Sequence, residues 1–105
     1  MDNIEIGEIF TGLGPVTIKR LFSGKGIYFE DVIVGIFMNG ELLLKANAKT
    51  APKFKAGGAK QWKHVGKQGK TTLMPYWTVP ADTFDDPENM VPWVKLAFAA
   101  AVASK

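Results

Sequence analysis

The segment SGKG at positions 23–26 contains the residue types of a phosphate-binding loop. Such a loop follows the pattern G-x-x-x-x-G-K-S/T and opens onto a helix, whose first backbone amides hold the phosphate. Here the glycine spacing differs, and Ile27, Tyr28 and Phe29 follow directly, which favours a strand. We therefore expect Gly24 and Gly26 to form a turn between two extended segments, without phosphate chemistry.

Residues for metal or nucleophile chemistry are scarce. The chain has no cysteine, and His64 is its one histidine, so thiolate nucleophiles, disulfides and His-rich metal sites are excluded. Hydrogen bonding at a sheet edge is the expected role of His64. The acidic residues at 82, 85, 86 and 88 lack the spacing of a calcium loop, and Asp86 suits a helix cap. We expect no metal, no cofactor and no enzymatic activity.

Basic charge is concentrated in the middle of the chain. From Lys45 to Lys70 there are eight lysines and no acid, whereas the rest of the 105 residues carries a net charge of −5. Six of these lysines are candidate contacts for nucleic-acid phosphates, with Trp62 available for base stacking: Lys53, Lys55, Lys60, Lys63, Lys67 and Lys70. Lysine offers no bidentate fork for reading bases, so such binding would be nonspecific. The alternative is a solvated surface without a ligand.

Tyr76 and Trp77 could line a pocket beside Pro75. Because side chains alternate along a strand, the alternative places one ring in the core and the other at the surface.

Hydrophobic periodicity, caps and turn residues define the elements that would position these side chains. Apolar residues at 6, 9, 10 and 13 predict a helix over about 3–13, with Asp2 or Asn3 as N-cap. Thr50 can cap a short helix ended by Gly57, and Asp86-Pro87 begins a final helix over about 87–103, in which Pro92 predicts a kink or a late start. Extended segments are expected at 16–22, at 27–29, from 32 to the Asn39-Gly40 turn and from 41 onward. A second hairpin is expected to join 62–65 to 71–79, and Pro75 implies a bulge or an edge position within it.

Asn39-Gly40 is the strongest local signal, because this pair accepts the positive φ angles of a two-residue type I′ hairpin. Its register places Phe37 opposite Leu42, Gly35 opposite Leu44 and Ile33 opposite Ala46, on one apolar face that should pack against helices. The other face carries Val34, Ile36, Met38 and Leu43.

Hairpins without crossovers predict an α+β domain with a two-layer architecture, in which an antiparallel sheet carries helices on one face, in the order α-β-β-β-β-α-β-β-α. We expect a single domain over 1–105. The acidic N-terminus lacks the charge of a secretory signal, and no apolar run reaches the roughly 20 residues that cross a bilayer. A cytoplasmic protein without a membrane contact is expected.

The chain resembles the N-terminal domain of the TfoX/Sxy family along nearly its whole length. Four segments carry the likeness, in this order: LGPVTIKRLFSGKGIY at 13–28, ELLLKANAKTAPKF at 41–54, MPYWTVPAD at 74–82 and DDPENMVPWVKLAFAAA at 85–101. The resemblance implies an α+β fold and a regulator of natural competence that acts with a CRP-type activator at promoters, without enzymatic activity. It implies a protein partner, such as the transcription machinery, but assigns no catalytic or binding residue.

The hairpin register also predicts self-association. If all helices pack on one face, Val34, Ile36, Met38 and Leu43 leave an apolar patch on the other, and a symmetric dimer would bury it. The alternative is a three-layer monomer in which a helix crosses to cover that face.

Overall fold

The structure, a computed structural model, describes residues 1–21 and 23–104. Phe22, the predicted end of the first strand, lies outside these residues. Three α-helices, six strands and one 3₁₀ segment follow in the predicted order α-β-β-β-β-α-β-β-α, with the 3₁₀ segment before the last helix. Their bounds are α1 Asn3–Ile9, β1 Thr17–Leu21, β2 Gly24–Phe29, β3 Val32–Met38, β4 Glu41–Lys45, α2 Ala51–Ala56, β5 Gln61–Val65, β6 Thr71–Thr78, η1 Ala81–Asp85 and α3 Pro87–Ala103.

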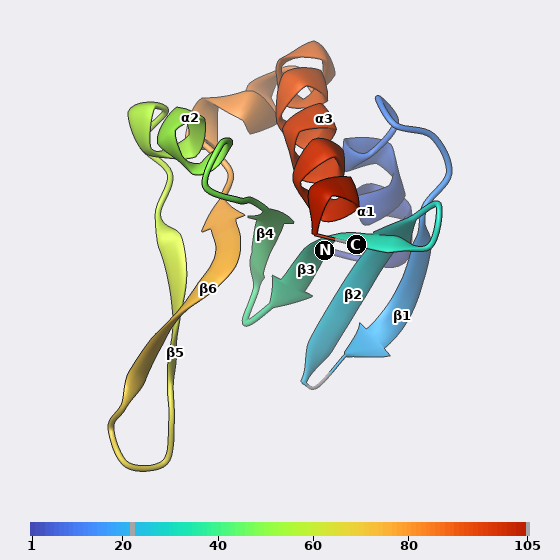
Figure 1. Cartoon of the computed structure of the whole chain (residues 1–105). Coiled ribbons are helices and arrows are strands. Elements are labelled where there is room, and N and C mark those ends of the chain that lie inside the picture. Colours follow the sequence, from blue (N-terminus) through green and yellow to red (C-terminus); the bar gives the residue numbers. More distant parts are fainter. Residues whose placement is uncertain (22, 105) are drawn as a thin grey trace.

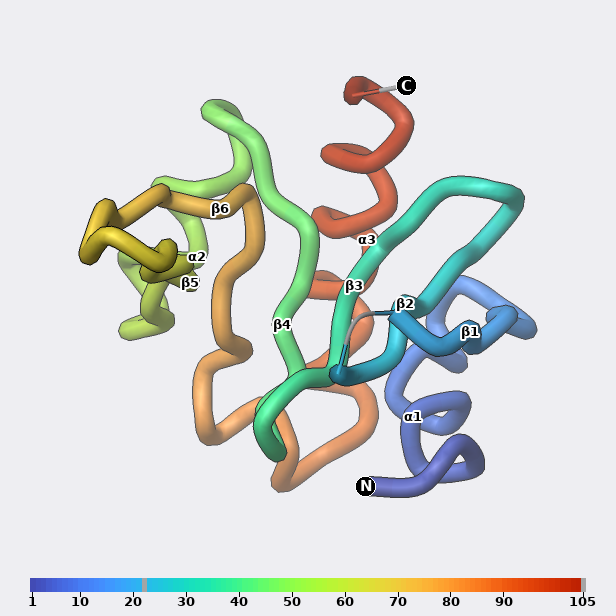
Figure 2. The backbone as a smooth tube through the Cα atoms, turned by 90° about the horizontal axis from the view of Figure 1, so that it is seen from below, coloured from blue at the N-terminus to red at the C-terminus, as the bar shows by residue number. Residues whose placement is uncertain are grey.

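The strands form one antiparallel sheet in the order β1-β2-β3-β4-β6-β5. Strands β3 and β4 lie at its centre, while β1 and β5 are its two edges (Figure 2). Helix α3 packs across β3 and β4, and the hairpin of β5 and β6 projects from the rest of the sheet (Figure 1). The predicted α+β fold is confirmed.

Local signals explain where most elements begin. The Asp2 carboxylate accepts a hydrogen bond from the Glu5 amide and caps α1, although the α-helix ends at Ile9, earlier than predicted. Asp86 accepts from the Glu88 amide and begins α3 at Pro87, so the late start that Pro92 suggested does not occur. These side chains satisfy amide donors that have no partner within their helices.

Two local predictions were wrong. Thr50 stands at the N-cap of α2 without capping it, because its hydroxyl oxygen accepts instead from the Asn47 amide at 2.9 Å. Gly24 and Gly26 lie inside β2 and not in a turn. A Cβ at Gly24 would overlap the carbonyl oxygen of Phe37, so this glycine permits close approach of β3.

The Asn39-Gly40 turn forms as predicted, with φ angles of 53° and 78°, and pairs Phe37 with Leu42 and Gly35 with Leu44. However, β3 contains a bulge that the sequence did not predict. Strand β2 pairs Ile27 with Gly35 but the next residue, Tyr28, with Ile33, so that one residue of β3 is left over. That residue is Val34.

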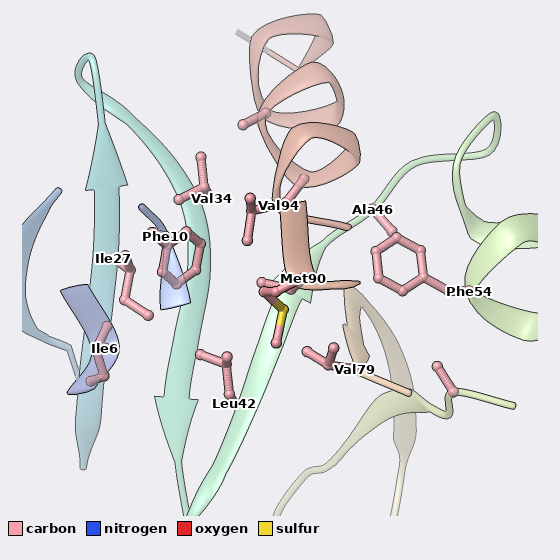
Figure 3. Packing of buried hydrophobic residues seen from close by; sticks show 14 of the residues in the cluster. Ile6, Phe10, Ile27, Val34, Leu42, Ala46, Phe54, Val79, Met90 and Val94 are labelled. Carbon is pink, nitrogen blue, oxygen red and sulfur yellow. The ribbon is translucent and has the colours of Figure 1, made fainter. Parts of the chain in front are cut away.

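The bulge exchanges two neighbouring side chains between the faces of the sheet. Val34 is fully buried on the side of the helices, next to Val94 of α3 (Figure 3), whereas Ile33 packs on the opposite side. The predicted facing of both residues was therefore wrong. Farther along β3, Phe37 faces the helices and Ile36 faces away, as predicted.

The helix-side core joins α1, α2 and α3 to the sheet (Figure 3). Helix α1 contributes Ile6, and Phe10 follows it as the C-cap residue. Helix α2 contributes Phe54, and α3 contributes Met90 and Val94. Because all three helices bury their apolar residues in this one cluster, the opposite face of the sheet is left without a helical layer. The two-layer architecture follows.

Candidate functional site

The six candidate lysines are distributed along one side of the molecule. Lys53 and Lys55 belong to α2, Lys60 directly precedes β5, Lys63 lies within β5, and Lys67 and Lys70 belong to the turn that joins β5 to β6. All six are exposed. Because α2 and the hairpin turn lie at opposite ends of this side (Figure 1), the structure does not gather the six lysines into one site.

Lys60 and Lys63 do come together with Trp62 at one groove. This groove of about 500 Å³ lies between the β3–β4 turn and the start of β5. Leu43 and Met38 form part of its apolar lining, and Glu41 is its carboxylate. The lining residues of the groove thus include two lysines, one aromatic residue and one acid, although the side chains of Trp62 and Lys63, neighbours in β5, point to opposite faces of the strand.

Trp62 belongs to an aromatic group on the face that the helices leave uncovered. Its ring centroid lies 6.3 Å from that of Tyr76 and 6.2 Å from that of His64, both in edge-to-face geometry. His64 is exposed on edge strand β5, and its side chain contacts the Trp62 ring. These edge-to-face contacts hold the Trp62 ring against the sheet.

Tyr76 and Trp77 point to opposite faces, as alternation requires, but neither is a free surface residue. Tyr76 is 8% exposed, and Trp77 packs against Phe54 of α2 with ring centroids 6.4 Å apart. The two rings therefore lie on opposite faces, as the alternative expected, and the half-buried Trp77 also lines a pocket with Pro75.

A partly buried cation accompanies Tyr76. Lys45 Nζ lies 5.1 Å from the centre of the Tyr76 ring. Burial lowers the pKa of the Lys45 ammonium below its ordinary value of 10.5. Burial also raises the pKa of the Tyr76 phenol, and the nearby Tyr28 phenol raises it further.

The predicted association patch is largely covered within the chain. Ile36 and Leu43 are 2% and 5% exposed, and Val34 belongs to the helix-side core. Met38 is half-buried at the groove. Around Ile36, Leu43 and Tyr76 we define the open-face cluster, which also contains Leu21, Ile33, Trp62 and Met74. Side chains of the sheet itself cover this face, and no helix among residues 1–21 and 23–104 crosses it.

The hairpin of β5 and β6 carries exposed features that the sequence interpretation missed. Val65 and Leu73 are 63% and 59% exposed, although both occupy strands. Strand β4 pairs with β6 only at residues 76–78, so the hairpin beyond this point extends past the rest of the sheet (Figure 1). Apolar residues on both sides of the polar turn at 66–70 were the available signal.

The backbone of β5 is free along its outer edge. The Gly66 amide donates to the Lys70 carbonyl at 2.8 Å, and hydrogen-bonded pairs alternate in an antiparallel ladder. The amide and carbonyl groups of Lys63 and Val65 therefore point away from β6. Since β5 is the last strand of the sheet, no strand of the described chain pairs with them.

The acidic run is distributed between two elements. Asp82 and Asp85 lie in η1, and Asp86 caps α3. Within residues 1–21 and 23–104, no group of three or more His, Asp or Glu side chains could hold a metal ion. In the same part of the chain, no helix has both the length and the apolar character needed to cross a membrane.

Comparison with protein families identifies the domain. The family model of the TfoX N-terminal domain matches residues 8–101, which include all six strands and nearly all of α3. No curated protein matches the chain. The family match supports a regulatory type of domain at the level of the family. With nearly the whole sequence matched, the chain belongs to the TfoX N-terminal domain family.

Proposed function

We propose that this protein is a regulatory module that acts in the cytoplasm on transcription, by contacting a partner protein and without catalysing a reaction. The observation that carries this proposal is the family match over residues 8–101. The resemblance to competence regulators supports a role near promoters, with a CRP-type activator or RNA polymerase as the partner.

The structure offers a physical basis for such contacts. A hairpin with a free strand edge and exposed apolar side chains extends beyond the sheet, where a partner can reach it. Regulatory modules of this kind act through exposed surfaces, and a free strand edge is one of the recurring surfaces for recognising extended peptides.

Co-purification tests the proposal. The tagged protein is cross-linked in its source cells and isolated, and the proteins that accompany it in stoichiometric amounts are identified. Each of them is then purified and tested for direct binding. We expect RNA polymerase or a CRP-type activator to bind. Repeated isolation without any stoichiometric protein partner would overturn the proposal.

A second candidate function is nonspecific binding of nucleic acid. It is favoured by the groove that Lys60, Trp62 and Lys63 help to line, since cations attract phosphates and an aromatic ring can stack on a base. With lysines alone, no base would be read by a bidentate contact. Lys67 and Lys70, farther along the hairpin, would contact further phosphates of the nucleic-acid backbone.

Salt dependence tests this second candidate. If four lysines contact phosphates, the logarithm of the affinity for duplex DNA should fall against the logarithm of salt concentration with a slope of about −3 to −4. Lys63→Gln should reduce the slope by about 1, whereas Lys95→Gln, on the exposed side of α3, should leave it unchanged. Absence of binding at roughly 50 mM salt and micromolar protein excludes this function.

A further inference from the structure

The projecting hairpin, residues 60–74, has three properties that are not explained by packing. Its outer edge presents the unpaired backbone groups of Lys63 and Val65. One of its faces carries Lys63, Val65 and Leu73 together, because Lys63 lies directly opposite Leu73 and two residues before Val65. The segment also contains four lysines and no acid.

We propose that the free edge of β5 binds an extended, acidic segment of a partner protein, which adds to the sheet as a seventh strand. This inference rests on the proposed function, since it names the chemistry by which the module would contact its partner. The backbone groups of Lys63 and Val65 would supply directional hydrogen bonds, and the exposed side chain of Val65 would contact an apolar residue of the added strand.

Charge selects the occupant of this edge. Lys60, Lys63, Lys67 and Lys70 give residues 60–74 a charge of +4, so carboxylates on the added strand would be attracted from either side. A second copy of this hairpin would bring the same four positive charges and be repelled. Lysines at an open edge are a known means of preventing such pairing between identical chains.

The apolar residues separate this proposal from nucleic-acid binding. Val65 and Leu73, beside Lys63, are 63% and 59% exposed. Exposing apolar side chains to water is unfavourable, and contacts with phosphates would not require it. An added strand with alternating acidic and apolar residues matches both the cations and these two side chains. It also uses the unpaired backbone groups, which a nucleic acid would leave free.

A fluorescein-labelled decapeptide of alternating glutamate and valine is the probe, and fluorescence anisotropy with the full chain is the readout. We expect saturable binding that weakens as salt is added. Val65→Pro should weaken it by about fivefold, the equivalent of one backbone hydrogen bond. Proline is tolerated where the amide of an edge strand faces solvent, so the hairpin of the variant should remain folded.

Variants of the peptide test the same contact without changing the protein. In a strand, the backbone groups of successive residues point to opposite edges. Two peptides are compared, one with N-methyl groups on the valines only and one with N-methyl groups on the glutamates only. Their affinities should differ: methylation of the amides that face β5 should weaken binding, and methylation of the amides that face away should leave the affinity of the parent peptide unchanged. Lys63→Glu should weaken binding, while the matched reversal Lys95→Glu on α3 should have little effect.

Three results would overturn the proposal: no binding of the acidic peptide, equal binding of both N-methylated peptides, or displacement of the peptide by an oligothymidylate that binds more tightly. The last would favour the nucleic-acid candidate. The proposed function is tested by a different result, the capture of a partner protein. If the Val65→Pro variant captures the same partner protein as the wild type, the proposed regulatory function is retained, but the assignment of the contact to β5 is wrong.

Discussion

Trp62 and Tyr76 meet edge to face, with ring centroids 6.3 Å apart, on the side of the sheet that has no helical layer. Together with Leu21, Ile33 and Met74, they cover Ile36 and Leu43, which would otherwise face water. The open-face cluster thus acts as a second, smaller core. Trp62 comes from the projecting hairpin, so the position of the hairpin is linked to this core.

Removal of Trp62 should uncover part of the cluster. We expect Trp62→Ala to lower the free energy of unfolding by about 2 kcal/mol, less than for a fully buried aromatic residue because Trp62 is half-buried. We also expect it to increase self-association, since apolar surface becomes exposed. Urea unfolding and light scattering measure the two effects. Leu73→Ala, on the same hairpin but 59% exposed, is the control and should change stability little; equal effects of both variants would contradict the account.

Ile36→Lys tests whether the open face is a core or a free surface. Ile36 is 2% exposed, so a charged side chain at this position should unfold the protein or destabilise it by several kcal/mol, on the order of 3 or more. Ile4→Lys, at a position that is 74% exposed in α1, should be nearly neutral. A folded, fully soluble Ile36→Lys protein with unchanged thermal stability would show that this face is not a core.

The glycines of α1 and β2 should respond oppositely to alanine. A Cβ at Gly7 has no atom within 4 Å, so Gly7→Ala should stabilise the protein by about 0.5–1 kcal/mol through helix propensity. A Cβ at Gly24 would meet the Phe37 carbonyl oxygen, so Gly24→Ala should destabilise it by about 1–3 kcal/mol. Chemical denaturation of both variants provides the comparison, and a Gly24→Ala protein as stable as the wild type would contradict the close approach of β2 and β3.

Alkaline stability should depend on Tyr76. Because burial first, and then Tyr28, raise the pKa of Tyr76 in the folded protein, the phenol ionises more readily after unfolding, where its pKa is near 10.0. Its contribution to stability is complete below pH 10.0 and is lost as the pH rises through the folded pKa. Tyr76→Phe should therefore lose less stability above pH 10.0 than the wild type does. Parallel losses in urea titrations of the two proteins would exclude this role.

Local chemistry made much of the fold predictable. Asn39-Gly40 fixed the central hairpin, and Asp86-Pro87 fixed the start of α3, because each pair satisfies a backbone requirement within a few residues. The bulge at Val34 was not predictable in the same way. It arises from how β2 pairs with β3, and nothing in the residues around Val34 alone specifies that offset.

The candidate site was predictable only in part. The lysine-rich segment was evident, but its division between α2 and the hairpin depends on where the chain turns after Gly57. The free edge of β5 depends on strand order, since β6, which follows β5 in the chain, pairs with β4 and leaves β5 outermost. Such long-range pairing is not encoded in local periodicity.

Site-specific photo-cross-linking in the source cells tests the central claim, that the module contacts its partner through the projecting hairpin. A photoreactive phenylalanine analogue is placed at position 65 in β5, and at position 4 in α1 as a control that is at least as exposed. We predict that position 65 cross-links to one protein through a segment rich in acidic residues and that position 4 does not. Cross-linking of that protein from position 4 alone, or cross-linking of position 65 to nucleic acid only, would contradict the claim.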